Sequence, residues 1–366
     1  MAGRFVSRLF RGPGPDDNPI TSIQGHECKK RHHHQREKKL ASHLYGKYSM
    51  ALVQANIINE DRCQLVSGPL SNASGGPTGV FVGIYDGHAG DICSQFVLDN
   101  LFNNLKTAIT SQPGHVDYTA ALQEAYSRTE NNFLEHATEN WEQNPKLASA
   151  GSCCLTGVVH GNVLYVANAG DSRAVLAKWG VGEQHPEVHP LSIDYNVKYL
   201  ERRNELQAEH PNDLNLFDVN NDGIYGVRGC VQVTKAIGDV YLKLDEFNRE
   251  PLEARYRQQH PILQPILNAE PTVLPYLLSL DDRFVIFGSG GLWRHTTNEE
   301  AVSIVKASPR SGAARALLKK ALDNTARRHN LVYEDLKHLP LAYKNNIHDD
   351  ISIVILYIDD LPAENQ

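Results

Sequence analysis

The sequence predicts one domain that combines short buried strands with amphipathic helices. The strands are short runs of β-branched and aromatic residues, of which 79–85 and 351–357 are the clearest. The helices show apolar residues at helical spacing, as in 91–110 and 117–140. No internal repeat and no linker interrupts this pattern, so we expect a single domain over 46–360.

The remaining elements follow the same two patterns. The other expected strands are 49–55, 153–159, 163–167 and 284–287. Two more helices are expected near the carboxyl end, at 297–307 and 311–328. The region 177–265 between these elements is less regular and rich in polar residues.

Length and composition are those of a globular intracellular protein. Of the 366 residues, 41% are hydrophobic and 22% are charged, which is normal for a soluble domain. No apolar run reaches the roughly 18 residues of a transmembrane segment. The net charge of −7 argues against a general nucleic-acid binder. Six scattered cysteines without a CxxC pair, and no apolar signal-peptide core, indicate reduced thiols in the cytoplasm, the nucleus or both.

Residues 1–45 differ in composition from the rest of the chain. Basic residues outnumber acidic ones, and the Gly-Pro-Gly-Pro run at 12–15 would break any early helix. We therefore expect a flexible basic N-terminal arm. An alternative is weak contact of Phe5, Leu9 and nearby arginines with an anionic membrane surface, at the periphery of the plasma membrane. A solvated tail is the favoured interpretation.

The clearest strand ends in Asp86-Gly87-His88. An aspartate is a hard oxygen ligand for a divalent cation, and a histidine is the usual proton-transfer group near neutral pH. The alternative is a strand that ends in an ordinary tight turn, for which Asp-Gly is common.

Carboxylates stand beside several of the expected strands. They are Glu60, Asp61, Asp86, Asp171, Asp239, Asp349 and Asp350. Taken singly, each is more often a turn or capping residue. They could converge only if the strand ends share one rim of a sheet or sandwich, and buried like charges would then need cations. Oxygen ligands favour Mg²⁺ or Mn²⁺ over Zn²⁺, and two such ions about 3.5–4 Å apart could aim a bridging water at phosphorus.

Five motifs occur in the order seen in one known family. They are Asp86-Gly87-His88-Ala89-Gly90, Ala167–Arg173, Gly238-Asp239, Gly291-Leu292-Trp293 and His348-Asp349-Asp350-Ile351-Ser352. In these motifs the chain resembles the metal-dependent protein phosphatases of the 2C type, over about residues 48–359. The stretch 151–154 looks like the plant subgroup that is similar in layout to pyruvate dehydrogenase phosphatase.

The resemblance implies an α+β fold and a general type of ligand. The fold is an αββα sandwich of two mainly antiparallel β-sheets flanked by helices, with metals at one edge of the sandwich. The implied cofactors are Mg²⁺ or Mn²⁺, two per site, and the implied partner is a phosphoprotein substrate. We expect a monomer.

The resemblance also implies ligand roles for residues of this chain. Asp86 would bridge the two metal ions through its carboxylate. The carbonyl of Gly87 would bind the second ion, and Asp349 would bind the first. Glu60 and Asp61 would hold metal-bound waters.

The implied reaction is hydrolysis of phosphoserine or phosphothreonine by direct attack of a metal-bridging water. Asp86 and His88 would be the catalytic residues. His88 would act as the general acid that protonates the departing serine or threonine oxygen.

Two positions depart from the family pattern. Gly290 stands where the family has a metal-ligand aspartate, and Arg294 replaces the usual acid after Trp293. Loss of even an outer-shell partner costs about 10- to 100-fold in metal affinity or activity. Arg294 could repel cations, or it could pair with Asp86 or Asp349 and occupy the space of a metal ion.

Two functional hypotheses therefore remain. The first, favoured by the family resemblance, is a working protein serine/threonine phosphatase with weak affinity for its first metal ion. The second is a pseudophosphatase, a binding or scaffold protein that engages phosphoproteins without turnover. Gly290 and Arg294 support the second hypothesis, whereas the intact Asp86, His88 and Asp349 support the first.

Overall fold

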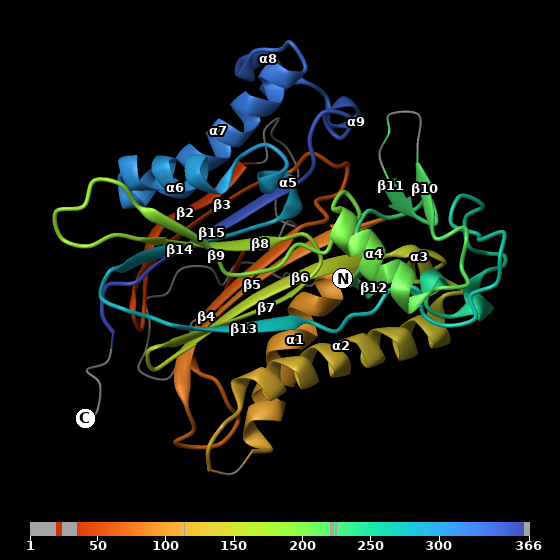
Figure 1. The fold of residues 1–366 in the computed structure, drawn as a ribbon, viewed down its shortest axis with the longest axis horizontal. Helices are drawn as coiled ribbons and strands as arrows, with labels where there is room; N and C mark the ends of the chain where they lie inside the picture. The colour runs from red at the N-terminus through yellow and green to blue at the C-terminus, as the bar shows by residue number, and fades with distance from the viewer. Residues whose placement is uncertain (1–19, 24–34, 113, 220–222, 224, 362–366) are drawn as a thin grey trace, which may run out of the picture.

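Two β-sheets packed face to face form the centre of the molecule, with helices on both outer faces. The computed structural model describes residues 20–23, 35–112, 114–219, 223 and 225–361. Figure 1 shows the four layers in order: α6 to α8, one sheet, the second sheet, then α1 and α2. The predicted αββα sandwich is confirmed.

The first sheet has the strand order β1-β4-β5-β6-β7-β13, and β12 also pairs with β6. Every pairing in it is antiparallel. Its strands are β1 (Ile20–Ile23), β4 (Arg62–Pro69), β5 (Thr78–His88), β6 (Gly151–His160), β7 (Val163–Ala169), β12 (Ile237–Gly238) and β13 (Thr272–Leu277).

The second sheet has the order β2-β3-β15-β14-β8-β9, and it is also antiparallel throughout. Its strands are β2 (Gln35–His43), β3 (Gly46–Val53), β8 (Arg173–Lys178), β9 (Glu187–Pro190), β14 (Asp282–Gly288) and β15 (Ile351–Tyr357). A separate hairpin consists of β10 (Phe217–Val219) and β11 (Tyr225–Val227).

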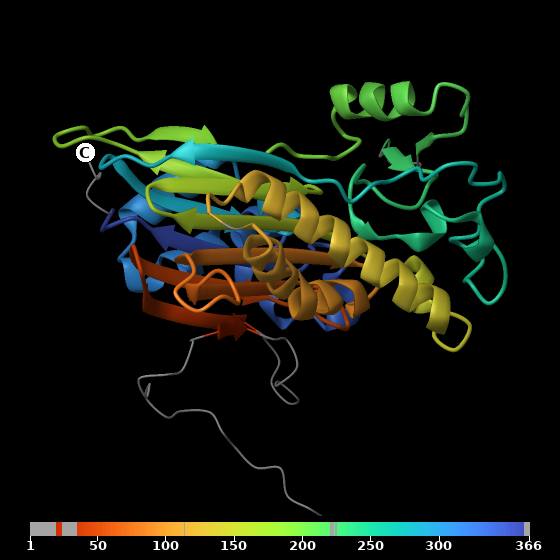
Figure 2. The ribbon, with the colours of Figure 1, turned by 90° about the horizontal axis from the view of Figure 1, so that it is seen from below.

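Two long helices cover the first sheet, and several shorter ones cover the second. The first pair is α1 (Ile92–Thr110) and α2 (Tyr118–Asn140), which lie across the sheet in Figure 2. Over the second sheet lie α6 (Asn298–Ala307), α7 (Ala313–Arg328) and α8 (Tyr333–His338). The other short helices are α3 (Lys146–Ser149), α4 (Leu200–Glu209), α5 (Gly290–Trp293), α9 (Leu341–Lys344), η2 (Val240–Leu242), η3 (Asp245–Phe247) and η4 (Arg310–Gly312).

The spacing of apolar residues predicted the two long helices accurately, because each helix has one buried and one exposed face. The expected ranges 91–110 and 117–140 agree with α1 and α2 to within one residue. Asp117 caps α2, since its side chain accepts a hydrogen bond from the backbone N–H of Ala120. Among the described residues, no helix has the length and hydrophobicity needed to cross a bilayer.

The segment expected to be a flexible arm, 1–45, contains two strands of the sandwich. Strand β1 pairs with β4, and β2 pairs with β3, so the expected boundary at 46 divides a pair of hydrogen-bonded strands. Residues 1–19 and 24–34 lie outside the described residues. Strand β2 is an edge strand, and edge strands favour charged residues because charge opposes pairing with other chains. Basic composition therefore did not distinguish this strand from an arm.

The two sheets are joined by an apolar layer in which residues of both sheets interdigitate. Met50, Val285 and Phe287 of the second sheet pack with Val82 and Leu155 of the first, and all five are buried. One further apolar cluster lies between each sheet and the helices that cover it. The sandwich thus has three apolar layers, and the middle one sets the spacing of the sheets.

A close contact of Phe287 with Gly157 shows how tight this middle layer is. A Cβ atom at Gly157 would lie 2.6 Å from Cζ of Phe287, so the ring of β14 packs directly on the backbone of β6. Only a glycine leaves room for the ring at this place.

We predict that Phe287→Ala lowers the free energy of unfolding by about 3–5 kcal/mol, because it leaves a cavity between the sheets. Urea denaturation followed by circular dichroism measures the change. Leu280→Ala, at a residue that is 81% exposed, is the control and should change the stability by less than about 0.5 kcal/mol. Equal effects of the two variants would contradict the assignment of Phe287 to the middle layer.

Candidate active site at one edge of the sandwich

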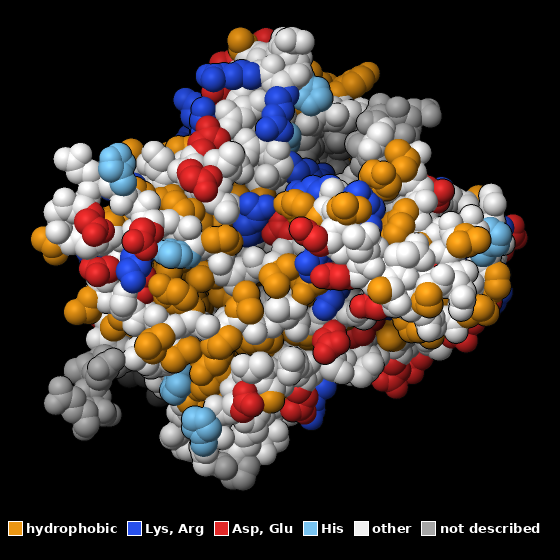
Figure 3. Space-filling view, in the orientation of Figure 1, with side chains coloured by type: hydrophobic (Ala, Val, Ile, Leu, Met, Phe, Trp, Pro, Cys, Tyr) orange, Lys and Arg blue, Asp and Glu red, His pale blue; other side chains and the backbone are white. Residues whose placement is uncertain are grey.

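A cleft of about 570 Å³ lies where strand ends from both sheets meet. Glu60 precedes β4, Asp86 and His88 end β5, and Asp349 precedes β15. These residues and Gly87 line the same cleft, although they come from different sheets and distant parts of the chain. The face of the molecule in Figure 3 has acidic, basic and apolar side chains interspersed, whereas the cleft gathers carboxylates.

Asp86 lies at the centre of this cluster. Its Oδ2 accepts a hydrogen bond from the backbone N–H of Gly290, at 2.8 Å. Burial raises the pKa of Asp86 well above its ordinary value, and the nearby carboxylates of Asp61 and Asp349 raise it further. The site therefore opposes ionisation of Asp86 in the absence of a compensating positive charge.

Glu60 and Asp61 lie beside Asp86 on the loop before β4. Oε1 of Glu60 accepts a hydrogen bond of 2.6 Å from the backbone N–H of Gly90. Burial, and then the charge of Asp350, raise the pKa of Glu60 to about 7. Asp61 is buried, and its Oδ2 has no hydrogen-bond partner within the part of the chain that the structure describes. A buried carboxylate oxygen of this kind fits a bound cation.

Asp350 holds the loop that carries Glu60. Its two carboxylate oxygens accept hydrogen bonds from the backbone N–H groups of Ala55 (2.6 Å), Asn56 (3.0 Å) and Glu60 (2.6 Å). The side chain is buried and does not line the cleft. Asp350 is thus a positioning residue for the loop.

Asp349 forms an ion pair with Arg294. Nη1 of Arg294 lies 3.2 Å from Oδ2 of Asp349, and the side chains are 44% and 30% exposed. The other oxygen of Asp349 accepts a hydrogen bond from Nδ2 of Asn56, at 3.1 Å. Burial acts to lower the pKa of Arg294, but the charges of Asp171 and Asp349 raise it above its ordinary value. Arg294 is therefore a fixed cation at the cleft.

The imidazole ring of His88 is held in place by the carboxylate of Asp239. Nε2 of His88 lies 2.8 and 2.9 Å from the two oxygens of Asp239, which is completely buried. Burial acts to lower the pKa of His88, but the charge of Asp239 and its hydrogen bond raise it to about 9. His88 is therefore a protonated imidazolium at neutral pH.

The His88–Asp239 pair depends on a glycine in the neighbouring strand. A Cβ atom at Gly151 would lie 2.3 Å from Nε2 of His88 and 2.3 Å from Oδ2 of Asp239. Asp239 itself adopts a left-handed backbone conformation with φ of 49°, which is unusual for a residue other than glycine. The lack of a side chain at Gly151 therefore leaves the space that the ion pair occupies.

Like Asp350, Asp171 and Asp239 are acids of the site that received no role from the sequence. Asp171 lines the cleft, where Asn196 donates to its Oδ2 at 2.7 Å and the thiol of Cys153 lies 3.6 Å from its Oδ1. Both acids follow short strands and occur in the five motifs, which was the available signal. Their partners are distant in sequence, so local patterns could not reveal the contacts.

Gly290 begins α5 opposite the carboxylates. A Cβ atom at this position would lie 2.7 Å from Oδ1 of Asp171 and 3.2 Å from Oδ2 of Asp86. A side chain here would therefore be directed at these two carboxylates. Its absence removes any ligand that position 290 could supply.

The two halves of the cleft differ in their fit to divalent cations. Among the described residues, no three His, Cys, Asp or Glu side chains form a ready-made metal site. Near Asp86, the unpartnered oxygen of Asp61 and the mutual repulsion of the acids fit one hard cation such as Mg²⁺ or Mn²⁺. Near Asp349, the guanidinium of Arg294 already provides a positive charge, and Gly290, which faces Asp171 and Asp86, supplies no carboxylate to a second cation.

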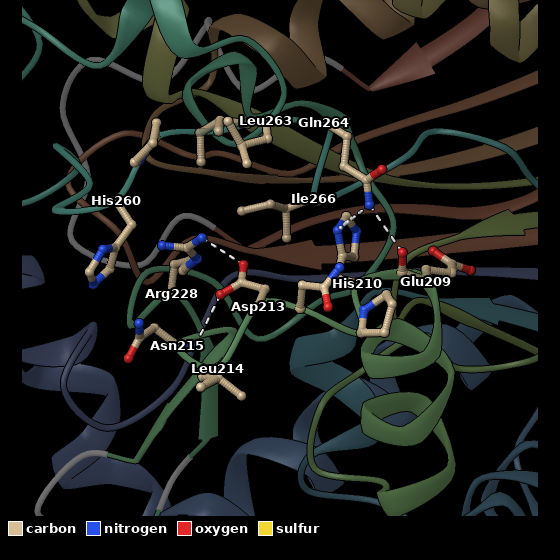
Figure 4. Close-up of a pocket in the computed structure, with 14 residues that line it drawn as sticks. Glu209, His210, Asp213, Leu214, Asn215, Arg228, His260, Leu263, Gln264 and Ile266 are labelled. Carbon is tan, nitrogen blue, oxygen red and sulfur yellow. Dashed lines mark hydrogen bonds and ion pairs between the residues drawn. The ribbon is translucent and has the colours of Figure 1, made fainter.

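A second pocket, of about 550 Å³, lies beside the end of α4 (Figure 4). Its polar groups pair with one another: Nη2 of Arg228 lies 2.6 Å from Oδ2 of Asp213, and Nε2 of Gln264 lies 2.8 Å from Nδ1 of His210. The pocket contains none of the clustered carboxylates. The pocket and the cleft have similar volumes. We assign the candidate site to the cleft because the clustered carboxylates line it.

Known proteins are similar to this chain in sequence and in fold. The sequence profile described as Protein phosphatase 2C matches residues 54–329. Probable protein phosphatase 2C 46 of Arabidopsis thaliana is 43% identical over 323 residues, which make up 88% of this chain and 84% of the relative. Probable protein phosphatase 2C 28 of Oryza sativa subsp. japonica is 40% identical, with coverage of 86% and 78%. The chain therefore belongs to the protein phosphatase 2C family.

Solved structures show the same fold at lower sequence identity. The crystal structure of serine-threonine phosphatase 2C from Toxoplasma gondii matches with a TM-score of 0.63 at 17% identity, over 88% of this chain and 98% of that chain. A C. elegans sex determining protein matches with a TM-score of 0.60 at 15% identity, over 91% and 66%. Family membership supports a metal-dependent protein serine/threonine phosphatase.

We predict that Asp239→Asn lowers the pKa of His88 from about 9, because the charge and the hydrogen bond of Asp239 are the largest influences that raise it. Burial is then opposed by the charges of Asp86 and Glu60 alone. An NMR titration of the metal-free protein measures this pKa. Since the raised pKa stabilises the fold below pH 6.5 and this stabilisation is lost as pH rises through 9, the stability difference between wild type and variant should narrow over that range.

The control is Asp281→Asn, at an aspartate whose side chain is 51% exposed and which does not line the cleft. It should leave the titration of His88 unchanged. A His88 pKa that stays near 9 in Asp239→Asn would show that another group holds the proton.

Proposed function

We propose that this chain is a metal-dependent protein serine/threonine phosphatase of reduced activity. The observation that carries the proposal is the His88–Asp239 pair beside Asp86 in the carboxylate-lined cleft. An acid with its proton in place and a cluster suited to a cation are the two components that phosphoester hydrolysis requires. The substrates are phosphoserine and phosphothreonine residues of proteins.

His88 supplies the proton that the leaving group needs. Attack of a water molecule on phosphorus forms one P–O bond and breaks the bond to the serine or threonine oxygen. The departing oxygen takes a proton from the imidazolium of His88. The inorganic phosphate that is released keeps the protons of the attacking water, and the neutral ring of His88 regains a proton from solvent. Because Asp239 binds Nε2, the other ring nitrogen, Nδ1, is the one left to deliver the proton. Asp239 keeps the ring charged and oriented.

The carboxylate cluster supplies the place for the cation. Asp86, the carbonyl of Gly87 and the acids Glu60 and Asp61 would hold one Mg²⁺ or Mn²⁺ ion. When bound, such an ion neutralises phosphoryl charge and lowers the pKa of water. Asp350 orients the loop of Glu60 through the three backbone hydrogen bonds described above. We propose that Asp349 is the carboxylate of the other half of the cleft. There the guanidinium of Arg294 already neutralises its charge.

A specific observation favours a second candidate, a phosphoprotein-binding protein without turnover. The Arg294–Asp349 ion pair occupies one half of the cleft, and Gly290 offers no carboxylate there. Loss of a ligand at a metal site costs at least the 10- to 100-fold known for outer-shell partners. The two candidates differ in whether any phosphate is released.

We predict slow release of phosphate from a phosphothreonine peptide by the purified full chain, rising with Mn²⁺ concentration up to the millimolar range. His88→Ala should lower the rate by about 10²- to 10⁴-fold, because the leaving oxygen then has no proton donor. Malachite-green detection of phosphate measures the rate. His189→Ala, at an exposed histidine of β9, is the matched control and should leave the rate unchanged.

Two other outcomes would assign the function differently. Release of phosphate that persists in His88→Ala would place the proton donor elsewhere. No release by the wild type at any Mn²⁺ concentration, with retained binding of the phosphopeptide, would establish the binding protein in place of the phosphatase.

A further inference from the structure

We propose that the guanidinium of Arg294 is the resident cation of the Asp349 half of the cleft, so that the protein binds one divalent cation instead of two. The inference shares its cleft with the proposed function and rests on the metal dependence proposed there. Its own basis is the placement of Gly290 and Arg294 relative to Asp349, Asp86 and Asp171.

The first argument is that Arg294 provides the positive charge that this half of the cleft needs. Among the described residues that line the cleft, Arg294 is the only lysine or arginine. Its Nη1 lies 3.2 Å from Oδ2 of Asp349. Arginine stays charged at any physiological pH, so this neutralisation does not depend on metal supply.

The second argument is that the two unusual residues share one turn of helix. The backbone N–H of Arg294 donates to the carbonyl of Gly290, at 3.0 Å, across α5. Residues four apart lie on the same face of a helix. Position 290 and Arg294 therefore lie on the same face at α5. A Cβ atom at 290 would face Asp171 and Asp86, and Arg294 pairs with Asp349.

The third argument is one of charge. With an aspartate at 290 and the usual acid at 294, a divalent cation would leave this part of the cleft with no net charge. Gly290 with Arg294 brings one positive charge without a metal ion. The remaining acids thus meet a permanent positive charge where the family pattern has a metal ion and two acids.

The fourth argument concerns space. A side chain at 290 would start 2.7 Å from Oδ1 of Asp171 and 3.2 Å from Oδ2 of Asp86. The backbone N–H of Gly290 donates to Asp86 at 2.8 Å. An aspartate at 290 would add a carboxylate at the point where two already lie, and only a metal ion could hold the three together.

The opposing interpretation is a weak surface ion pair. Arg294 and Asp349 are 44% and 30% exposed, and exposed pairs contribute little to stability. On that view a metal ion would displace Arg294 without resistance. The two interpretations predict different metal stoichiometries when position 290 is restored.

The experiment is isothermal titration of Mn²⁺ into the metal-free full chain, with native mass spectrometry to count bound ions. We expect one ion in the wild type and, in G290D, a second ion only weakly bound. In G290D/R294A we expect a second ion bound at least about tenfold more tightly than in G290D. G290D/R294K, which keeps the positive charge, should behave as G290D does.

The matched control is G290D/R310A. Arg310 is 47% exposed and pairs with Asp359 at 2.8 Å, so it resembles Arg294 in exposure and pairing but does not line the cleft. This variant should bind Mn²⁺ as G290D does. Thermal unfolding by circular dichroism verifies that each variant is folded before its metal ions are counted.

Two results would overturn the inference: two ions bound tightly by the wild type, or equal affinity for the second ion in G290D and G290D/R294A. The count of ions does not depend on turnover, so absence of phosphate release leaves the inference intact. A wild type that binds no Mn²⁺ would overturn both the metal-dependent function and the stoichiometry of one.

Discussion

Mutual repulsion among the carboxylates that meet in the cleft is the constraint on which the site depends. Asp61 is buried and Asp86 is half-buried beside it, and desolvation raises the pKa of each. Such a cluster persists only where positive charge or hydrogen-bond donors compensate it. The structure shows the Gly290 N–H on Asp86 and the guanidinium of Arg294 on Asp349. Among the described residues, Oδ2 of Asp61 has no hydrogen-bond partner, and this oxygen fits a cation in the Asp86 half of the cleft.

The site exists only because two sheets are held at a fixed spacing. Asp86 ends a strand of one sheet, whereas Asp349 begins a strand of the other. The apolar layer between the sheets, where Phe287 packs on the backbone at Gly157, therefore sets the distance between these acids. The packing of the core therefore determines the geometry of the site, because a shift of one sheet against the other would separate the carboxylates.

Sequence patterns revealed the features that depend on short-range order. The two long helices and buried strands such as β5 and β15 follow from the spacing of apolar residues, whereas the buried strand β4 was not predicted. The pairing of His88 with Asp239 did not, because 151 positions separate the two residues and only the fold brings them together. Gly151 is another example, since its lack of a side chain has a reason only once that ion pair is seen. Strand β2 was missed because edge strands and solvated arms share a basic composition.

The two halves of the cleft differ because different groups face their carboxylates. A backbone N–H is a neutral donor, so the hydrogen bond from Gly290 orients Asp86 without cancelling its charge. A guanidinium is a full cation, so Arg294 cancels the charge of Asp349. The demand for a divalent cation thus remains around Asp86, Glu60 and Asp61 and is met around Asp349. Two neighbouring acids therefore differ in what they can bind, although both belong to one cluster.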